Sequence, residues 1–312
     1  MNPDPAPGGV SQATYSPPAA IADMPHLDGV THRTVQLPGV RLHVAEAGSG
    51  EPLLLLHGFP LHWWAWHRAI PRLAQHYRVI CPDLRGAGWS DAPRDGYTPE
   101  QLLADLLALL YALEIPRARI IAHDWGAIVA YNLALRHPER VERLVSLAAP
   151  PPFTQIGWKF LPLMRFLWFQ PVVATGVIGP RQLGRGRQRL TRHLLHGFAA
   201  RPDTFSDADV ENYLAPLRDP AHARAGSALY RHFILPSAMK IARRGYMAEH
   251  LTPPTLVIGG GADPAMQPDL LGDYSEHAAD LTLEFIPGAG HYVADDEPEQ
   301  FADSALRFFA RA

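Results

Sequence analysis

Short apolar runs recur along the chain, and Gly, Pro or charged residues bound each of them. They lie at residues 53–56, 78–82, 118–122, 144–147, 255–258 and 281–286. Runs of this length without alternating polarity are typical of strands that are buried on both faces. Before them, residues 34–37 and 40–45 alternate in polarity on either side of Pro38-Gly39, which predicts a hairpin.

Stretches with helical spacing separate most of these runs. The clearest starts with Thr98 as N-cap, Pro99 at the first helical position and Gln101 at the third, and leucines follow at helical spacing up to Leu113. A second helix-like run covers residues 127–135. Strands that alternate with helices indicate an α/β fold, with a mostly parallel sheet covered by helices on both faces.

The alternation stops at three consecutive prolines, Pro150 to Pro152. From there to about residue 250, arginine and aromatic residues occur at helical spacing, and strand patterns return only after residue 252. We therefore expect a helical cap at residues 151–250, inserted into a core made of residues 29–150 and 251–312. Residues 1–28 are rich in Pro, Ala and Gly, and we expect a disordered tail there.

Composition restricts the partners and the compartment. The formal net charge of −3 gives no reason to expect nucleic acid or a membrane as partner. Cys81 is the single cysteine, so an intramolecular disulfide is excluded, and a reducing, cytoplasmic compartment fits best. No apolar run approaches the ~18 residues that a membrane span needs. Assembly into a homo-oligomer stays open.

Asp124 is the most informative candidate for chemistry. It lies in Ala122-His123-Asp124-Trp125-Gly126, between a strand candidate and a helix-like run. A small-x-nucleophile-x-Gly turn at such a junction presents its middle side chain above the carboxyl ends of the strands. An aspartate in this place can attack a saturated carbon and form an alkyl ester, which water must then cleave. That scheme needs a general base and a group that orients the base.

Two residues further along the chain fit these roles. His291 follows the last strand candidate in a Gly-rich loop and is the candidate general base. Asp263 follows the run at residues 255–258 and is the candidate acid that holds the imidazole in the required tautomer. A lone aspartate at a turn means little, but the three residues occur in the order nucleophile, acid, histidine. No His-Glu-x-x-His motif occurs, so a metal site has no support.

Four further polar residues near these positions have structural interpretations. His57 and His123 are expected to brace loops through hydrogen bonds rather than to act as bases. Asp295 and Asp296 follow the candidate base and are expected to cap the last helix.

These motifs together resemble the α/β-hydrolase superfamily, and within it the aspartate-nucleophile group of epoxide hydrolases and haloalkane dehalogenases. The resemblance covers about residues 30–150 and 250–312. It is carried by His57-Gly58-Phe59-Pro60, Asp83-Leu84-Arg85-Gly86-Ala87-Gly88-Trp89-Ser90, His123-Asp124-Trp125-Gly126 and Gly290-His291. It implies an eight-stranded, mostly parallel sheet with an inserted helical cap, an oxyanion hole formed by the N–H groups of Phe59 and Trp125, and no cofactor.

The resemblance also implies roles for cap residues. Epoxide hydrolases carry two cap tyrosines that hydrogen-bond the epoxide oxygen, and Tyr230 matches the second of them. No tyrosine occurs between residues 150 and 201, where the first belongs, and Tyr213 is a candidate replacement or a packing residue. Haloalkane dehalogenases hold the halide with ring N–H groups, which Trp125 together with Trp168 or Trp158 can supply.

The sequence thus predicts a hydrolase that opens small apolar epoxides to vicinal diols with water, through an ester on Asp124. Trp125, Trp168 and Tyr213 are the candidate substrate-binding residues. A haloalkane dehalogenase with the same mechanism is the first alternative. A hydrolase-fold protein that binds a ligand without turnover is the second.

Overall fold

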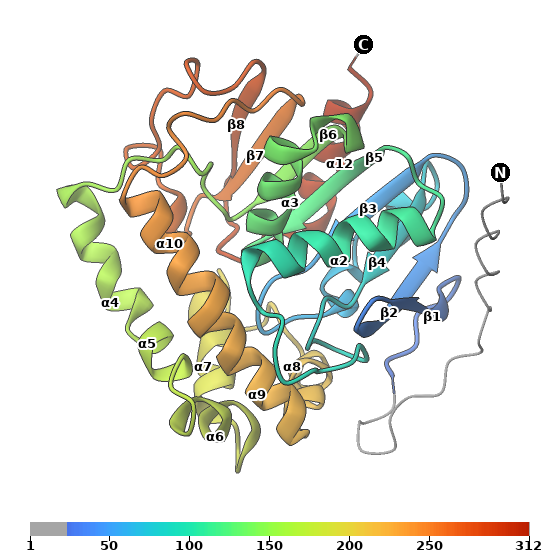
Figure 1. Cartoon of the computed structure of the whole chain (residues 1–312), viewed down its shortest axis with the longest axis vertical. Helices are drawn as coiled ribbons and strands as arrows, with labels where there is room; N and C mark the ends of the chain where they lie inside the picture. Colours follow the sequence, from blue (N-terminus) through green and yellow to red (C-terminus); the bar gives the residue numbers. More distant parts are fainter. Residues whose placement is uncertain (1–23, 312) are drawn as a thin grey trace, which may run out of the picture.

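The computed structural model describes residues 24–311. Its eight strands form one sheet in the order β1-β2-β4-β3-β5-β6-β7-β8 (Figure 1). β2 is antiparallel to both of its neighbours, whereas every pair from β4 to β8 is parallel. The predicted fold class is therefore confirmed. The strands are β1 (Thr31–Leu37), β2 (Val40–Ala47), β3 (Pro52–Leu56), β4 (Arg78–Pro82), β5 (Ala118–His123), β6 (Val141–Leu147), β7 (Thr255–Gly260) and β8 (Leu281–Ile286).

The central strands are largely apolar because both faces of the sheet are covered. In β3, Leu54 and Leu56 belong to one hydrophobic cluster, while Leu53 and Leu55 belong to a second cluster. All four side chains are fully buried. Successive side chains of a strand point to opposite faces, so a strand between two cores shows a continuous apolar run.

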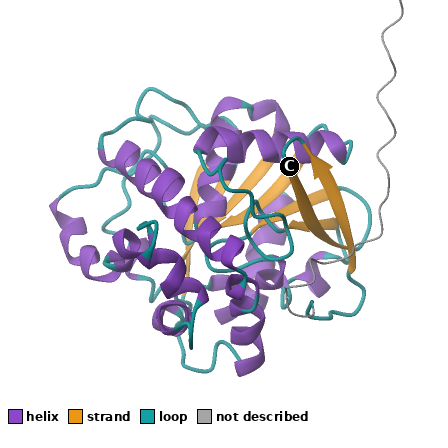
Figure 2. Ribbon diagram, turned by 60° about the horizontal axis from the view of Figure 1, so that its bottom comes forward, coloured by secondary structure: helices purple, strands orange, loops and turns teal. Residues whose placement is uncertain are grey.

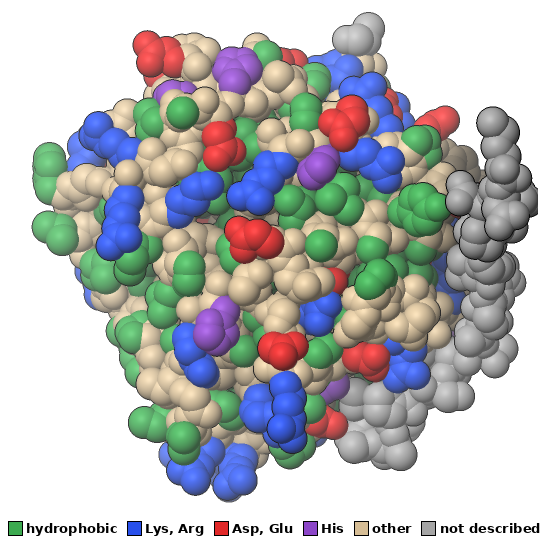
Figure 3. All heavy atoms as spheres, viewed as in Figure 1, with side chains coloured by type: hydrophobic (Ala, Val, Ile, Leu, Met, Phe, Trp, Pro, Cys, Tyr) green, Lys and Arg blue, Asp and Glu red, His purple; other side chains and the backbone are tan. Residues whose placement is uncertain are grey.

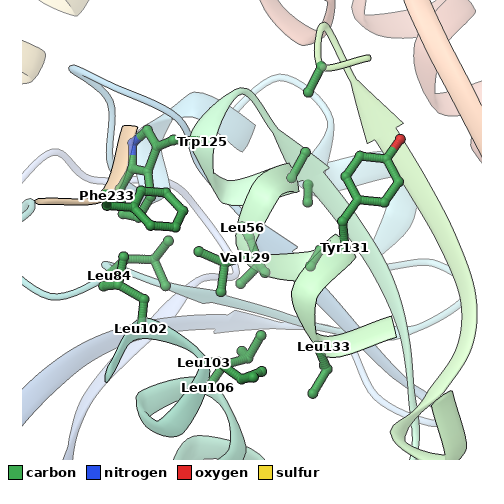
Figure 4. Close-up of a cluster of buried hydrophobic side chains, with 14 of the residues drawn as sticks. Leu56, Leu84, Leu102, Leu103, Leu106, Trp125, Val129, Tyr131, Leu133 and Phe233 are labelled. Carbon is green, nitrogen blue, oxygen red and sulfur yellow. The ribbon is translucent and has the colours of Figure 1, made fainter. Parts of the chain in front are cut away.

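Helices cover the two faces. α2 (Pro99–Ala112) and α3 (Trp125–Arg136) pack on one face, where leucines of α2 meet Val129 and Leu133 of α3 (Figure 4). The predicted N-cap of α2 is confirmed, because the Thr98 hydroxyl accepts the N–H of Gln101 at 3.3 Å. The other cluster contains residues of η1 (Trp63–Trp66), α1 (Ile70–Leu73), α11 (Val293–Asp296) and α12 (Pro298–Phe309).

The segment between β6 and β7 is helical, and its helices lie beside the sheet in both ribbon views (Figures 1 and 2). This is the cap. Outside the cap, a short helix, η2 (Pro138–Arg140), lies between α3 and β6. The cap elements are η3 (Trp158–Leu163), α4 (Met164–Leu167), α5 (Phe169–Val173), α6 (Ile178–Gly184), α7 (Arg189–Phe198), α8 (Asp207–Leu214), η4 (Pro216–Arg218), α9 (Pro220–Leu229), η5 (Tyr230–Ile234) and α10 (Leu235–Ala242).

The tail expected at residues 1–28 falls largely outside the described residues. Its last part is described, and there the side chains of Met24 and Leu27 pack, partly buried, against the second hydrophobic cluster. The packed part of the chain thus begins before residue 29. Within residues 24–311, none of the helices has the length and apolar character needed to cross a membrane.

Candidate active site

A strained turn presents Asp124 between β5 and α3. Its φ of 51° and ψ of −125° are rare for a residue with a side chain, and such strain is typical of functional positions. The N–H of Asp124 donates to the carbonyl of Leu147 at 3.1 Å, which ties the turn to the end of β6. α3 begins at the next residue, so the positive end of a 12-residue helix lies beside the carboxylate.

Two glycines allow the turn to lie against the end of β3. A Cβ atom on Gly126 would lie 2.4 Å from the carbonyl oxygen of His57 and 2.8 Å from that of Leu56. A Cβ atom on Gly58 would lie 2.6 Å from the Cβ of Asp124. Because backbone and carboxylate occupy these places, larger residues would push the turn away from the loop that follows β3.

That loop supplies a hydrogen bond to the candidate nucleophile. The N–H of Phe59 donates to Oδ2 of Asp124 at 3.1 Å. His57 braces the loop, since its Nε2 accepts the N–H of Leu84 at 3.0 Å and its Nδ1 donates to the carbonyl of Gly58 at 2.9 Å. Burial lowers the pKa of His57, so the ring is neutral. Its predicted structural role is confirmed by these contacts.

His291 and Asp263 form a hydrogen-bonded pair. Nδ1 of His291 lies 3.0 Å from Oδ2 of Asp263, whose side chain is 1% exposed. The other carboxylate oxygen accepts the N–H of Ala265 at 2.9 Å, at the start of η6 (Pro264–Met266). A carboxylate on Nδ1 keeps the proton there and leaves the Nε2 lone pair free to accept a proton.

The charges around His291 stabilise its protonated form. Burial by itself would lower the pKa of this imidazole, but the hydrogen bond that it donates to Asp263 and the negative charges of Asp263 and Asp124 outweigh it. The net effect raises the pKa of His291 above its ordinary value. The carboxylate of Asp124 therefore acts electrostatically on the candidate base.

The loop that carries His291 is fixed from two sides. Nε2 of His123 donates to the carbonyl of His291 at 3.0 Å, which confirms the bracing role expected for His123. Burial first, and then His291, lower the pKa of His123 to about 4. Asp296 accepts the N–H of Gly290 at 2.8 Å and that of Ala200 at 3.1 Å, so it joins this loop to the cap.

The prediction that Asp295 and Asp296 cap the last helix is wrong. α12 starts after Glu297 without a side-chain cap, and both aspartates lie buried within the preceding short helix, α11. A helix cap is a local pattern, whereas the partner of Asp296 comes from a cap segment almost a hundred residues earlier in the sequence.

Tyr230 lies at a π-helical turn between α9 and α10. The N–H of Leu235 bonds to the carbonyl of Tyr230, five residues back, and Pro236 follows without an N–H of its own. The ring of Tyr230 packs edge-on against Phe59, with 5.1 Å between ring centroids. Burial, and after it the charge of Asp124, raise the pKa of Tyr230 well above its ordinary value. Its hydroxyl is therefore protonated and within electrostatic reach of the carboxylate.

The other proposed substrate-binding residues are placed differently. Trp125 is buried, and its ring packs against Phe233 at 6.0 Å (Figure 4). With Tyr213 it lines a pocket between the loops after β3 and β4 and the cap. The pKa of Tyr213 is raised by burial and then by Asp295 and Asp209, two carboxylates other than the candidate nucleophile. Trp168 stands apart from this group, because its side chain is half exposed and its ring contact is with His193 at 6.4 Å.

Two residues of the site were not predicted from the sequence. Burial, and then the charge of Asp124, raise the pKa of Tyr292, whose hydroxyl donates to the carbonyl of Leu194 in α7 at 3.3 Å. Phe198 accepts the N–H of His291 on its carbonyl at 2.9 Å, and its ring packs 5.9 Å from the imidazole. Tyr292 could have been predicted as a site residue because it directly follows His291 in the sequence. Phe198 comes to the site only through the folding of the cap.

Comparisons with known proteins agree with this geometry. Residues 51–298 match the family described as the alpha/beta hydrolase fold. The chain is 31% identical over 292 residues to a soluble epoxide hydrolase of Corynebacterium sp. (strain C12), covering 90% of this chain and 98% of the relative. It is 28% identical to epoxide hydrolase 3 of Mus musculus, covering 85% of this chain and 73% of the relative.

A solved structure gives the same result for the fold. The crystal structure of Cfl2 from Burkholderia cenocepacia is similar with a TM-score of 0.79 and 34% identity, covering 93% of this chain and 99% of that one. The chain therefore belongs to the alpha/beta hydrolase fold family, and its relatives within that family include epoxide hydrolases.

Proposed function

We propose that this protein opens epoxides to vicinal diols through an alkyl ester on Asp124. The observation that carries the proposal is that Asp124 and Tyr230 both contact Phe59. Oδ2 of Asp124 accepts the N–H of Phe59 at 3.1 Å, and the ring of Tyr230 packs on the Phe59 ring with 5.1 Å between centroids. The His291–Asp263 pair supplies the base, and the charge of Asp124 contributes to the raised pKa of His291 and of Tyr230. A nucleophile, a base and a protonated hydroxyl are the groups that ring opening and ester hydrolysis require.

In the first step, Oδ1 of Asp124 attacks a ring carbon from the side opposite the C–O bond that breaks. Oδ2 is already bonded to the Phe59 N–H, so it becomes the carbonyl oxygen of the ester. Tyr230 gives its proton to the departing oxygen, because an alkoxide is a stronger base than a phenolate. The products of this step are an alkyl ester on Asp124 and a free hydroxyl on the substrate.

In the second step, Nε2 of His291 takes a proton from water, and the resulting hydroxide attacks the ester carbonyl of Asp124. Negative charge develops on the oxygen that faces the N–H of Phe59. The N–H of Trp125, in the first turn of α3, has no acceptor within its own helix and is the proposed second donor. When the C–O bond of the ester breaks, the proton of the attacking hydroxide passes to the departing oxygen, so the diol leaves and Asp124 is again a carboxylate. The proton on His291 returns to the Tyr230 phenolate.

Ester formation also prepares the base. The Asp124 carboxylate is one of the charges that raise the pKa of His291, and the ester has no such charge. The pKa of His291 should therefore fall when the ester forms. The imidazole then favours its neutral form at the step in which it must accept a proton.

Haloalkane dehalogenation is the second candidate, and one observation favours it. The indole Nε1 of Trp125, the residue after the nucleophile, is buried and finds no hydrogen-bond acceptor within residues 24–311. A buried donor without an acceptor can stabilise a departing halide ion. The same attack by Asp124 and the same hydrolysis by His291 would follow.

Product analysis separates the two reactions. The purified protein would be incubated with styrene oxide and, in parallel, with a bromoalkane of similar size. Diol formation from the epoxide at a higher kcat/KM than bromide release supports the proposal. Bromide release without diol formation would establish the dehalogenase instead, and turnover of neither substrate would leave a ligand-binding protein.

A further inference from the structure

The first helices of the cap expose an unusual set of apolar side chains. Leu161 in η3, Met164 in α4 and Trp168, the residue between α4 and α5, follow one another at helical spacing, so they share one face. Singly exposed apolar residues are common on protein surfaces, but grouped ones mark contact surfaces. The exposed fractions are 44% for Ile156, 78% for Trp158, 69% for Leu161, 61% for Met164, 51% for Trp168, 62% for Val177 and 51% for Ile178.

The same segment is strongly basic. Residues 151–202 contain eight basic residues and no acidic residue, although the whole chain has a net charge of −3. Apolar and basic side chains accordingly lie intermixed at the edge of the molecule where Figure 1 places α4 (Figure 3). The basic residues are Lys159, Arg165, Arg181, Arg185, Arg187, Arg189, Arg192 and Arg201.

An arginine-lined groove adjoins the apolar face. It lies between α6 and α9 and is lined by Val177, Arg181, Arg185, Arg218 and Arg224, among others. Val177 belongs both to the exposed apolar set and to this groove. The groove therefore continues the apolar face rather than forming a separate site.

Most of the positive charge in this groove is not neutralised. Arg218 pairs with Glu211, which is also held by Arg192. Throughout residues 24–311, the ion pairs include none to Arg181, Arg185 or Arg224. Guanidinium groups bind phosphate oxygens through paired N–H donors, so the groove suits a phosphate-bearing partner.

We infer that this face, defined as η3, α4, α5 and the groove between α6 and α9, docks on a lipid surface with anionic headgroups. The exposed apolar residues would enter the headgroup region, where tryptophan is favoured, and the unpaired arginines would bind lipid phosphates. A second copy of the chain fits this face less well. A symmetric contact would bring two sets of unpaired arginines together, and like charges repel.

This inference differs from the expectation of no membrane partner, which rested on the net charge of the whole chain. Net charge averages over the molecule, whereas docking depends on the charge of one face. The inference is also independent of the proposed reaction, because Asp124, His291, Asp263 and Tyr230 take no part in it, and Trp168 lies apart from them on the cap surface.

The test is sedimentation of the full chain with vesicles. One set would contain phosphatidylcholine alone, and the other an equimolar mixture of phosphatidylcholine and phosphatidylglycerol. We expect binding to the mixed vesicles that weakens as salt is added. Removing one surface arginine should weaken binding roughly fivefold, so Arg181→Ala with Arg185→Ala should weaken it on the order of 25-fold. Leu161→Ser with Met164→Ser should also reduce it.

Matched controls lie outside this face. Tyr111, on α2, is 76% exposed, and Arg94 is exposed in the loop before α2. Tyr111→Ser and Arg94→Ala should bind mixed vesicles like the unaltered protein. Unchanged unfolding midpoints in urea would show that each variant is folded, which is expected for exposed positions.

Four results of the vesicle experiments, and a fifth from size-exclusion chromatography, would overturn the inference. They are the absence of binding to mixed vesicles, equal binding to neutral vesicles, and an equal loss of binding in the control variants. The fourth is displacement by inorganic phosphate but not by sodium chloride of the same ionic strength, which would identify a site for small anions. Size-exclusion chromatography completes the test, because a dimer that Leu161→Ser with Met164→Ser converts to a monomer would identify a second copy as the occupant.

Discussion

Asp263→Asn should slow the second step of the reaction and leave the first step largely intact. The carboxylate is buried and lies 3.0 Å from Nδ1 of His291. A hydrogen bond to a charged group contributes about 1.5–3 kcal/mol, and losing it corresponds to roughly a 10- to 150-fold lower rate. An asparagine amide can also donate to Nδ1, which moves the imidazole proton to Nε2. The wrong tautomer can bring the total loss to about 10⁴-fold.

The assay is rapid mixing with an epoxide in single-turnover experiments, with ester and diol measured separately. Ester formation needs Asp124 and Tyr230, so its rate should change by less than about threefold, while diol formation falls and the ester accumulates. The Asp263 charge also helps to raise the pKa of His291, so the acid limb of the pH profile should move to lower pH in Asp263→Asn. Equal losses in both steps, or diol formation at the unaltered rate, would refute the assigned role of Asp263.

Three further predictions concern other parts of the site. Tyr230→Phe should lower kcat for epoxides by roughly 10- to 100-fold and leave bromoalkane turnover nearly unchanged, whereas a smaller loss than in Tyr213→Phe would contradict the assignment. Ester hydrolysis, followed by rapid quench across pH, should speed up as pH rises through the pKa of His291 and should stay fast above it; a rate independent of pH would exclude the imidazole as base. Gly126→Ala would place a Cβ 2.4 Å from a backbone oxygen and should lower the free energy of unfolding, measured in urea, by about 1–3 kcal/mol. The control is Gly157→Ala, whose new Cβ would have no atom within 4 Å and which should change the free energy of unfolding by less than about 0.5 kcal/mol.

The sequence predicts the core of this fold well because local patterns there agree with the tertiary structure. Continuous apolar runs mark strands buried on both faces, and their positions fix where the loops after β3, β5, β7 and β8 must lie. The start of β6 is less visible. Glu142 and Arg143 interrupt the apolar pattern there. Glu142 forms an ion pair at 2.5 Å with Arg119 of the neighbouring strand β5.

The cap side of the site is harder to predict, since its contacts join segments that are far apart in the sequence. No local pattern shows that Phe198 packs on His291, or that Asp296 holds the backbone of Ala200. The same reason explains why Trp168, which the resemblance implied as a substrate-binding residue, lies half exposed on the cap. Helical spacing predicts that a segment is a helix, but it does not predict which face of that helix meets the core.

The central claim is that the carboxylate of Asp124 becomes covalently alkylated during turnover, and mass spectrometry of a His291→Gln variant tests it most directly. Without the base, the ester should persist, so the intact protein should gain the mass of one epoxide molecule. Peptide mapping should locate that mass on Asp124, and the double variant with Asp124→Asn should not gain it. A folded His291→Gln protein that consumes the epoxide without any adduct, or that carries the adduct on another residue, would contradict the account.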